Sequence, residues 1–145
     1  LSSLRSPSLL NVFPSLPNLK WEDIRITFDQ GDAIVVSAQK TIKRFSFSEI
    51  GFKDGRKANQ PDMFWIALKR FAVNAGELSF QTNGVEPQIR RNLKTYVKEL
   101  RKRLKALFQL SDDPFFDYDK RHIYKTRFKI TDRNPDLYAI SNSDD

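Results

Sequence analysis

Hydrophobic and polar residues alternate along the first third of the chain. Every second residue is apolar in IRITF at 24–28, and KRFSFSEIGF at 43–52 has a similar spacing. The apolar run AIVVSA at 33–38 lies between these two segments, after a turn signal at 29–32. A period of two residues is typical of a strand with one buried face. The pattern therefore predicts an antiparallel β-meander.

The apolar residues change to steps of three and four after Pro61. Proline suits the first turn of a helix, because its missing N–H would have no partner there. We predict a helix over residues 62–75, capped by Asn59 or Gln60 and ended by Gly76. Its buried face would comprise Phe64, Ala67, Leu68, Phe71 and Ala75.

A second, longer helix is predicted from about Pro87 to Gln109. The segment before it, ELSFQTNGVEP at 77–87, is expected to be a connection with at most one short helical turn. One side of the long helix is apolar and predicts burial against a core; it comprises Ile89, Leu93, Tyr96, Val97, Leu100, Leu104, Leu107 and Phe108. The other side is basic and comprises Arg90, Arg91, Lys94, Lys98, Arg101, Lys102 and Lys105.

Alternation returns in FFDYDKRHIYKTRFKI at 115–130, where we predict a β-hairpin. Its turn would include Asp119, Lys120 and Arg121. One face of its second arm is packed and the other is largely basic, because Tyr124, Thr126, Phe128 and Ile130 alternate with Ile123, Lys125, Arg127 and Lys129. We expect His122 to be an exposed turn residue, and we expect hairpin or core packing for the aromatic residues Phe115, Phe116, Tyr118 and Tyr124.

The long helix carries the net charge of the chain. Residues 89–108 hold eight of the 25 Lys and Arg residues and one of the 18 acidic residues, so their net charge of +7 equals that of the whole chain. Like charges at i,i+4, such as Lys94 and Lys98, destabilise a helix by roughly 0.2–0.5 kcal/mol per pair. An anionic partner would relieve this repulsion. Nucleic acid is the first candidate, ahead of a solvated surface or a membrane surface.

The composition does not favour an enzyme. The chain has no cysteine, which excludes disulfide bonds, thiolate metal sites and a cysteine nucleophile, and it has a single histidine. The acidic residues at 112–113, at 117 and 119, and at 49 lack the spacing of a catalytic or metal site. We therefore expect no enzymatic activity, no metal and no cofactor. No apolar run approaches the roughly 20 residues that span a bilayer, so we expect a cytoplasmic protein without a membrane partner.

Three regions are expected along the chain. Residues 1–20 contain three prolines and five serines and predict a linker or extended arm, whose apolar residues would dock on the domain. Residues 21–133 would form the folded domain, and residues 134–145 a polar tail. The first residue is Leu1 rather than methionine, so we expect the chain to derive from a longer protein.

Two segments carry a resemblance to a known family. YVKELRKRLKALF at 96–108 and YKTRFKI at 124–130 resemble the recognition helix and the wing strand of the OmpR-type effector domains of bacterial response regulators. The resemblance implies a divergent winged helix-turn-helix domain of the α+β class, with an N-terminal antiparallel β-meander, a long basic recognition helix and a C-terminal β-hairpin wing.

The resemblance also implies a function, namely sequence-specific binding of double-stranded DNA by the output module of a bacterial transcriptional regulator. The basic helix would lie in the major groove, and the hairpin would contact the adjacent backbone or minor groove. The DNA-binding residues would be Arg90, Arg91, Lys94, Lys98, Arg101, Lys102, Lys105, Lys120, Arg121 and Lys125. A preceding sensor or receiver domain and a homodimer are further expected partners. RNA binding and a protein-interaction module within a larger assembly stay open as alternatives.

Overall fold

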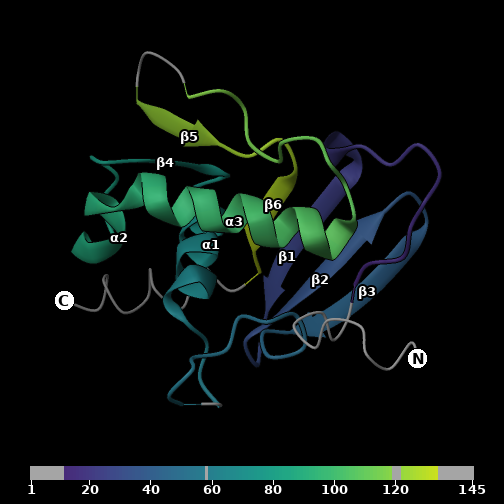
Figure 1. The fold of residues 1–145 in the computed structure, drawn as a ribbon, viewed down its shortest axis with the longest axis horizontal. Coiled ribbons are helices and arrows are strands. Elements are labelled where there is room, and N and C mark those ends of the chain that lie inside the picture. Colours follow the sequence, from purple (N-terminus) through teal and green to yellow (C-terminus); the bar gives the residue numbers. More distant parts are fainter. Residues whose placement is uncertain (1–11, 58, 119–121, 134–145) are drawn as a thin grey trace.

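The protein has a mixed α+β fold. The computed structural model describes residues 12–57, 59–118 and 122–133. The described residues form a sheet of four strands, a separate pair of short strands, and three α-helices, which are arranged as in Figure 1. The helices are α1 (Met63–Val73), α2 (Pro87–Arg91) and α3 (Leu93–Phe108).

The predicted meander is confirmed and forms three strands of the sheet. These antiparallel strands are β1 (Ile24–Asp29), β2 (Ala33–Ala38) and β3 (Thr41–Ser46), and a single 3-10 turn, η2 (Trp21–Asp23), precedes them. Every second side chain of β1 is buried, as its alternation predicts. The third strand is shorter than expected. A turn follows it, in which the N–H of Phe52 donates to the carbonyl of Phe47 at 2.9 Å.

The fourth strand of the sheet comes from the end of the described chain. β6 (Lys129–Asp132) lies parallel to β1, and the strand order is β3-β2-β1-β6. A parallel neighbour requires a long crossover, and all three helices lie in the chain between these two strands. The two-stranded sheet pairs β4 (Glu77–Ser79) with β5 (Ile123–Lys125). The prediction of a strand-free connection over residues 77–87 is therefore wrong.

The predicted hairpin over residues 115–130 is not formed as a two-stranded unit. Its arms meet in one antiparallel bridge, between Phe115 and Thr126. The rest of the second arm pairs elsewhere, because β5 binds β4 and β6 binds β1. The alternation of buried and accessible side chains along residues 123–130 is nevertheless as predicted. The predicted turn residues Asp119, Lys120 and Arg121 lie outside the described residues.

Helix α1 begins at Met63, later than a cap at Asn59 or Gln60 would place its start. Its cap is Asp62, whose Oδ1 accepts the N–H of Trp65 at 3.0 Å. This cap is stronger than Asn59 or Gln60 could provide, because its oxygen reaches a free N–H of the first turn. The helix ends before Gly76, which has a φ of +86° and donates its N–H to the carbonyl of Phe71 at 2.7 Å.

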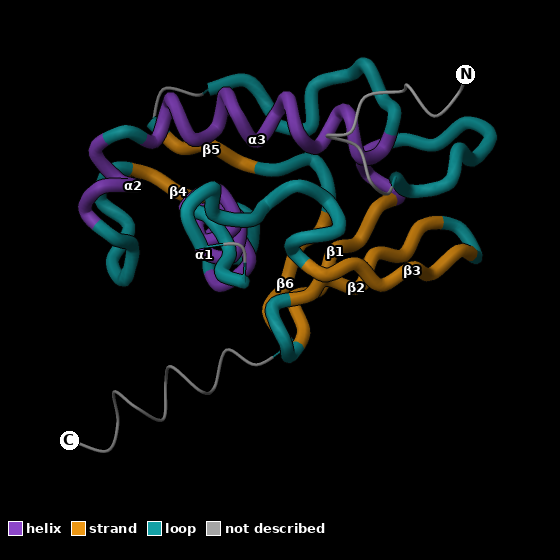
Figure 2. Tube along the Cα trace, turned by 60° about the horizontal axis from the view of Figure 1, so that its bottom comes forward, coloured by secondary structure: helices purple, strands orange, loops and turns teal. Residues whose placement is uncertain are grey.

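The predicted helix from Pro87 to Gln109 is divided into α2 and α3. The division lies at Asn92, where φ is −117° and ψ is 31°. The side chain of Asn92 donates to the carbonyl of Gln88 at 3.0 Å, so it competes with the backbone for helical hydrogen bonds. Figures 1 and 2 show that α2 turns away from the axis of α3.

Helix α3 forms a layer over α1 and the four-stranded sheet (Figure 2). All eight residues of the apolar side predicted for the long helix are buried in the core; Ile89 belongs to α2 and the other seven to α3. Helix α1 packs on α3 and also on β1 and β6. The end of α3 is covered by the N-terminal segment, because Phe13 is fully buried and its N–H donates to the carbonyl of Leu107 at 2.9 Å.

Candidate nucleic-acid interface

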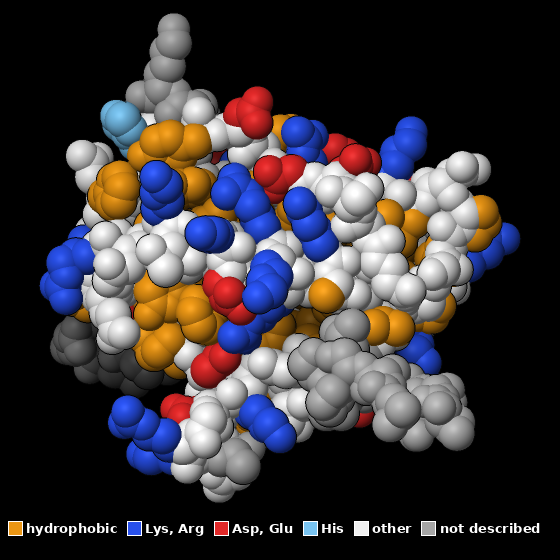
Figure 3. Space-filling model, in the orientation of Figure 1, with side chains coloured by type: hydrophobic (Ala, Val, Ile, Leu, Met, Phe, Trp, Pro, Cys, Tyr) orange, Lys and Arg blue, Asp and Glu red, His pale blue; other side chains and the backbone are white. Residues whose placement is uncertain are grey.

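The outward surface of α2 and α3 carries five basic residues that form no ion pair with any described residue. We call this set the basic face; it comprises Arg91, Lys94, Lys98, Lys102 and Lys105. The first four side chains are exposed and Lys105 is half-buried. Figure 3 shows basic side chains gathered over α3 in the middle of this surface. Their helical positions place them opposite the buried apolar side.

A groove of about 610 Å³ runs beside the basic face. Its lining includes three residues of that face, Lys98, Lys102 and Lys105. Phe64 of α1 supplies an apolar wall. The basic face therefore borders a concave surface as well as the convex surface of the helix.

The acidic residue of this helix pair is already engaged by another partner. Glu99 accepts a hydrogen bond from Nε of Arg103 at 2.9 Å, on the flank of α3 that faces α1. An exposed Glu–Lys pair at i,i+4 stabilises a helix by only about 0.3–0.5 kcal/mol. Among the described residues, the basic face lacks even this small stabilisation, because none of its lysines pairs with a glutamate. The repulsion predicted from the sequence is thus present on the described surface.

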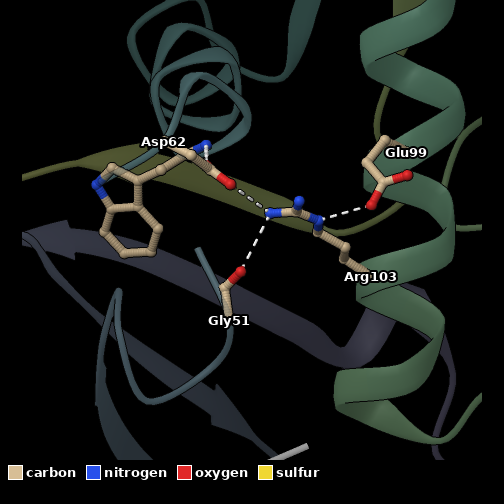
Figure 4. Close-up of polar contacts among 5 residues, drawn as sticks. Gly51, Asp62, Glu99 and Arg103 are labelled. Carbon is tan, nitrogen blue, oxygen red and sulfur yellow. Dashed lines mark hydrogen bonds and ion pairs between the residues drawn. The ribbon is translucent and has the colours of Figure 1, made fainter. Parts of the chain in front are cut away.

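Arg103 holds α3 in place and is absent from the residues predicted to bind DNA. Its Nη1 donates to Oδ2 of Asp62 at 2.9 Å and to the carbonyl of Gly51 at 3.3 Å (Figure 4). The guanidinium also lies over two rings, 4.9 Å from the centre of Phe52 and 4.6 Å from the centre of Phe64. Asp62 thereby caps α1 with one oxygen and binds α3 with the other. This network fixes the basic face relative to the rest of the fold.

Arg101 is one of the predicted DNA-binding residues, but the structure gives it an internal partner. Its Nε donates to Oδ1 of Asp113 at 3.0 Å, and its guanidinium lies 5.6 Å from the centre of Phe115. Oδ1 of Asp113 also accepts the N–H of Phe115 at 2.9 Å. Arg101 therefore ties α3 to the segment that follows it, so its charge is partly neutralised.

The other predicted residues differ in their accessibility. Arg90 is half-buried, and its Nε is buried without a hydrogen-bond partner. Lys125 is exposed, and its Nζ lies 3.7 Å from Glu77 and 5.7 Å from the ring centre of Phe116. Lys120 and Arg121 lie outside the described residues. The structure therefore brings Arg91, Lys94, Lys98, Lys102 and Lys105 together as unpaired cations, whereas Arg101 and Lys125 have acidic neighbours.

The start of α2 is held by an ion pair with α1. Arg70 binds Glu86 through two hydrogen bonds, at 2.9 Å from Nε and 2.6 Å from Nη2. The hydrogen bond from Arg70 holds the pKa of the Glu86 carboxyl below its usual value, although partial burial opposes the change. Glu86 is the N-cap residue of α2. This pair therefore orients the short helix that carries Arg91.

The described residues contain no cluster of potential metal ligands. No group of three or more acidic or histidine residues in residues 12–57, 59–118 and 122–133 could hold a metal ion. No helix of this part of the chain is long and apolar enough to cross a membrane. In comparisons with protein families, curated proteins and solved structures, nothing matches the chain.

Proposed function

We propose that the chain binds double-stranded DNA through the basic face, as the sequence-reading output module of a transcriptional regulator. The observation that carries this proposal is the set of four lysines along one side of α3, with Arg91 at the end of α2, none of which has an acidic partner among the described residues. A folded protein gains nothing from this repulsion unless an anion occupies the surface. A duplex has one phosphate charge for each ~1.7 Å of its axis, so it can bind several of these side chains at once.

The arrangement of helices supports a winged-helix type of contact. Helix α3 has 16 residues, and at about 1.5 Å per residue it is long enough to cross a major groove that is about 12 Å wide. The order α1, β4, α2, α3, β5, with β4 paired to β5, places three helices beside a small sheet. Two features depart from a simple winged helix-turn-helix: a single residue separates α2 from α3, and β6 joins the main sheet.

The proposal assigns different tasks to the basic residues. Arg91 lies at the end of α2, two residues before the start of α3, and is exposed. An arginine near the N-terminal end of a recognition helix is placed to read a guanine edge, with a discrimination of about 1–3 kcal/mol. Lys94, Lys98 and Lys102 lie further along the helix and neutralise phosphates. Arg101 supports the helix through Asp113 and contributes less to binding.

The proposal is tested by measuring the affinity for a fluorescently labelled random 20-base-pair duplex in 50 and 200 mM salt. The wild type is compared with the triple variant Arg91→Ala, Lys94→Ala, Lys98→Ala. We expect the slope of log affinity against log salt to fall by about 0.9 for each lost phosphate contact. Folding should be unchanged, because surface substitutions usually alter stability by no more than about 0.5 kcal/mol.

A matched control removes the same number of charges from the four-stranded sheet instead of from α2 and α3. Arg25, Lys43 and Lys129 are exposed on the four-stranded sheet and form no ion pair with a described residue. Their triple alanine variant has the same net charge as the first variant. Equal losses in both variants would show that binding depends only on net charge. Absence of binding by the wild type in 50 mM salt would refute the proposed function itself.

A further inference from the structure

We infer that the end of the two-stranded sheet next to the basic face is a stacking site for an unpaired nucleobase. The site comprises Phe80, Tyr118 and His122, which we call the aromatic end. This inference rests on the proposed function, because the base would belong to a nucleic acid that α3 holds. The basic face alone would not distinguish a fully paired duplex from one that carries an unpaired base. The aromatic end would favour the duplex with the unpaired base.

The aromatic side chains of this site are unusually accessible. Phe80 is 47% exposed and Tyr118 is 41% exposed, although both are large rings. The sequence predicted hairpin or core packing for Tyr118; its ring packs on Tyr124 and also remains accessible. Ser79 pairs with Ile123, so the next residues of the two strands, Phe80 and His122, come to the same end of the small sheet.

Tyr118 is held in position by its neighbours. Its ring centre lies 4.5 Å from that of Tyr124, which is buried. Its hydroxyl lies 3.0 Å from Nδ1 of His122, so the two groups share a hydrogen bond. A ring fixed on one side and exposed on the other can accept a base without ordering of its side chain. This preorganisation lowers the entropy lost on binding.

The aromatic end adjoins the cations of α3. Burial raises the pKa of Tyr124, and the neighbouring Tyr118 adds to this effect, whereas the positive charge of Arg101 opposes it. The geometry agrees, because the guanidinium of Arg101 lies 5.6 Å from the ring centre of Phe115, and Phe115 pairs with Thr126, two residues after Tyr124. Figure 3 shows hydrophobic side chains at the upper left of the surface that carries the basic side chains of α3. A strand bound along α3 can thus reach the aromatic end.

The chemistry favours a nucleobase over a purely apolar ligand. Successive bases offer π faces next to negative phosphates, and this site offers rings next to positive side chains. Tyr118 and His122 also provide hydrogen-bonding groups beside the rings. Bases within an intact duplex are already stacked on each other, so only an unpaired base can use the site. The two surfaces therefore predict a preference for duplexes that end in a short single strand.

The inference is tested with two DNA probes, a blunt 20-base-pair duplex and the same duplex with a three-nucleotide overhang. We expect the wild type to bind the overhang duplex more tightly, by roughly 5- to 100-fold, the range typical of one stacked base. Tyr118→Ala should remove this difference and leave the affinity for the blunt duplex unchanged. Tyr118→Phe keeps the aromatic ring, so this variant should retain most of the preference for the overhang duplex. Ile42→Ala alters another exposed apolar side chain, 69% accessible on β3, and serves as the control.

A fluorescent base reports on stacking directly. With 2-aminopurine in the overhang, binding by the wild type should quench its emission, whereas binding by the Tyr118→Ala variant should not. Equal affinities of the wild type for both probes would overturn the inference, as would a preference that survives in the Tyr118→Ala variant. In these outcomes the blunt duplex is still bound, so the proposed function stands. Loss of all binding by the wild type would instead refute the proposed function.

Discussion

Replacement of Arg103 by alanine should destabilise the fold more than replacement of any other basic residue of α3. Arg103 forms ion pairs of 2.9 Å with both Asp62 and Glu99, and its side chain is 22% exposed. Removing one partner of a fully buried pair costs about 3–5 kcal/mol. The exposed fractions of Asp62 and Glu99 are 17% and 33%, so solvent reduces this cost. Including the contacts with two rings, each worth roughly 0.5–1 kcal/mol, we expect a loss of about 2–3 kcal/mol.

The matched comparison is Arg101→Ala in the same helix. Arg101 has one ion pair, in which its side chain is 30% exposed and that of Asp113 is 43% exposed. Such pairs contribute roughly 0–1 kcal/mol. Urea denaturation of both variants, with the unfolding slope checked against the wild type, gives the two free energies of unfolding. A loss for Arg103→Ala no larger than that for Arg101→Ala would refute the role of the network in fixing α3.

Two further predictions concern the loop after α1 and the start of α2. Gly76→Ala should cost about 2–4 kcal/mol, because the φ of Gly76 is +86° and an added Cβ would meet Oγ1 of Thr126 at 2.6 Å. Gly84→Ala, where φ is +79° but the space is open, should cost only about 1–2 kcal/mol when both variants are unfolded in urea; equal losses would contradict this explanation. The lowered pKa of Glu86 means that its pair with Arg70 stabilises the fold fully above its usual pKa of 4.5, and that this stabilisation is lost as the pH falls below that value. The difference in unfolding free energy between wild type and Glu86→Gln should therefore shrink from pH 7 to pH 3, and a constant difference would be evidence against the ion pair.

The sequence predicts those parts of the fold that depend on local periodicity. The apolar side of α3 repeats over several turns, and the alternation in β1 matches a strand with one buried face. The break at Asn92 escapes this reasoning, because the apolar spacing continues across it from Ile89 to Leu93. Asparagine is a weak helix former, and its presence at position 92 was the sequence feature that could have indicated a break in the helix. The position of the basic residues on one side of the helix could be predicted from the sequence. Which of them form ion pairs with acidic residues could not.

The remaining features depend on contacts between distant parts of the chain. β4 and β5 have three residues each, too few to show a period, and neither reveals that it pairs with the other. The partners of Arg103 and Arg101 are likewise set by the fold, since Asp62 lies 41 positions before Arg103 and Asp113 lies 12 positions after Arg101. Spacing alone does not distinguish an arginine that supports the fold from one that is free to bind a ligand.

The parallel pairing of β6 with β1 has a consequence for synthesis of the protein in the cell. β1 is synthesised before its neighbour β6, which starts at Lys129 and is made only after all three helices. Until then one edge of β1 has unpaired backbone groups, which can bind another extended chain. α1 packs on β6 as well as on β1. Part of the surface on which α1 packs is therefore also missing until β6 has been made. A nascent chain that stalls in or before α3 would therefore expose this edge and would be the form of the protein most prone to aggregate.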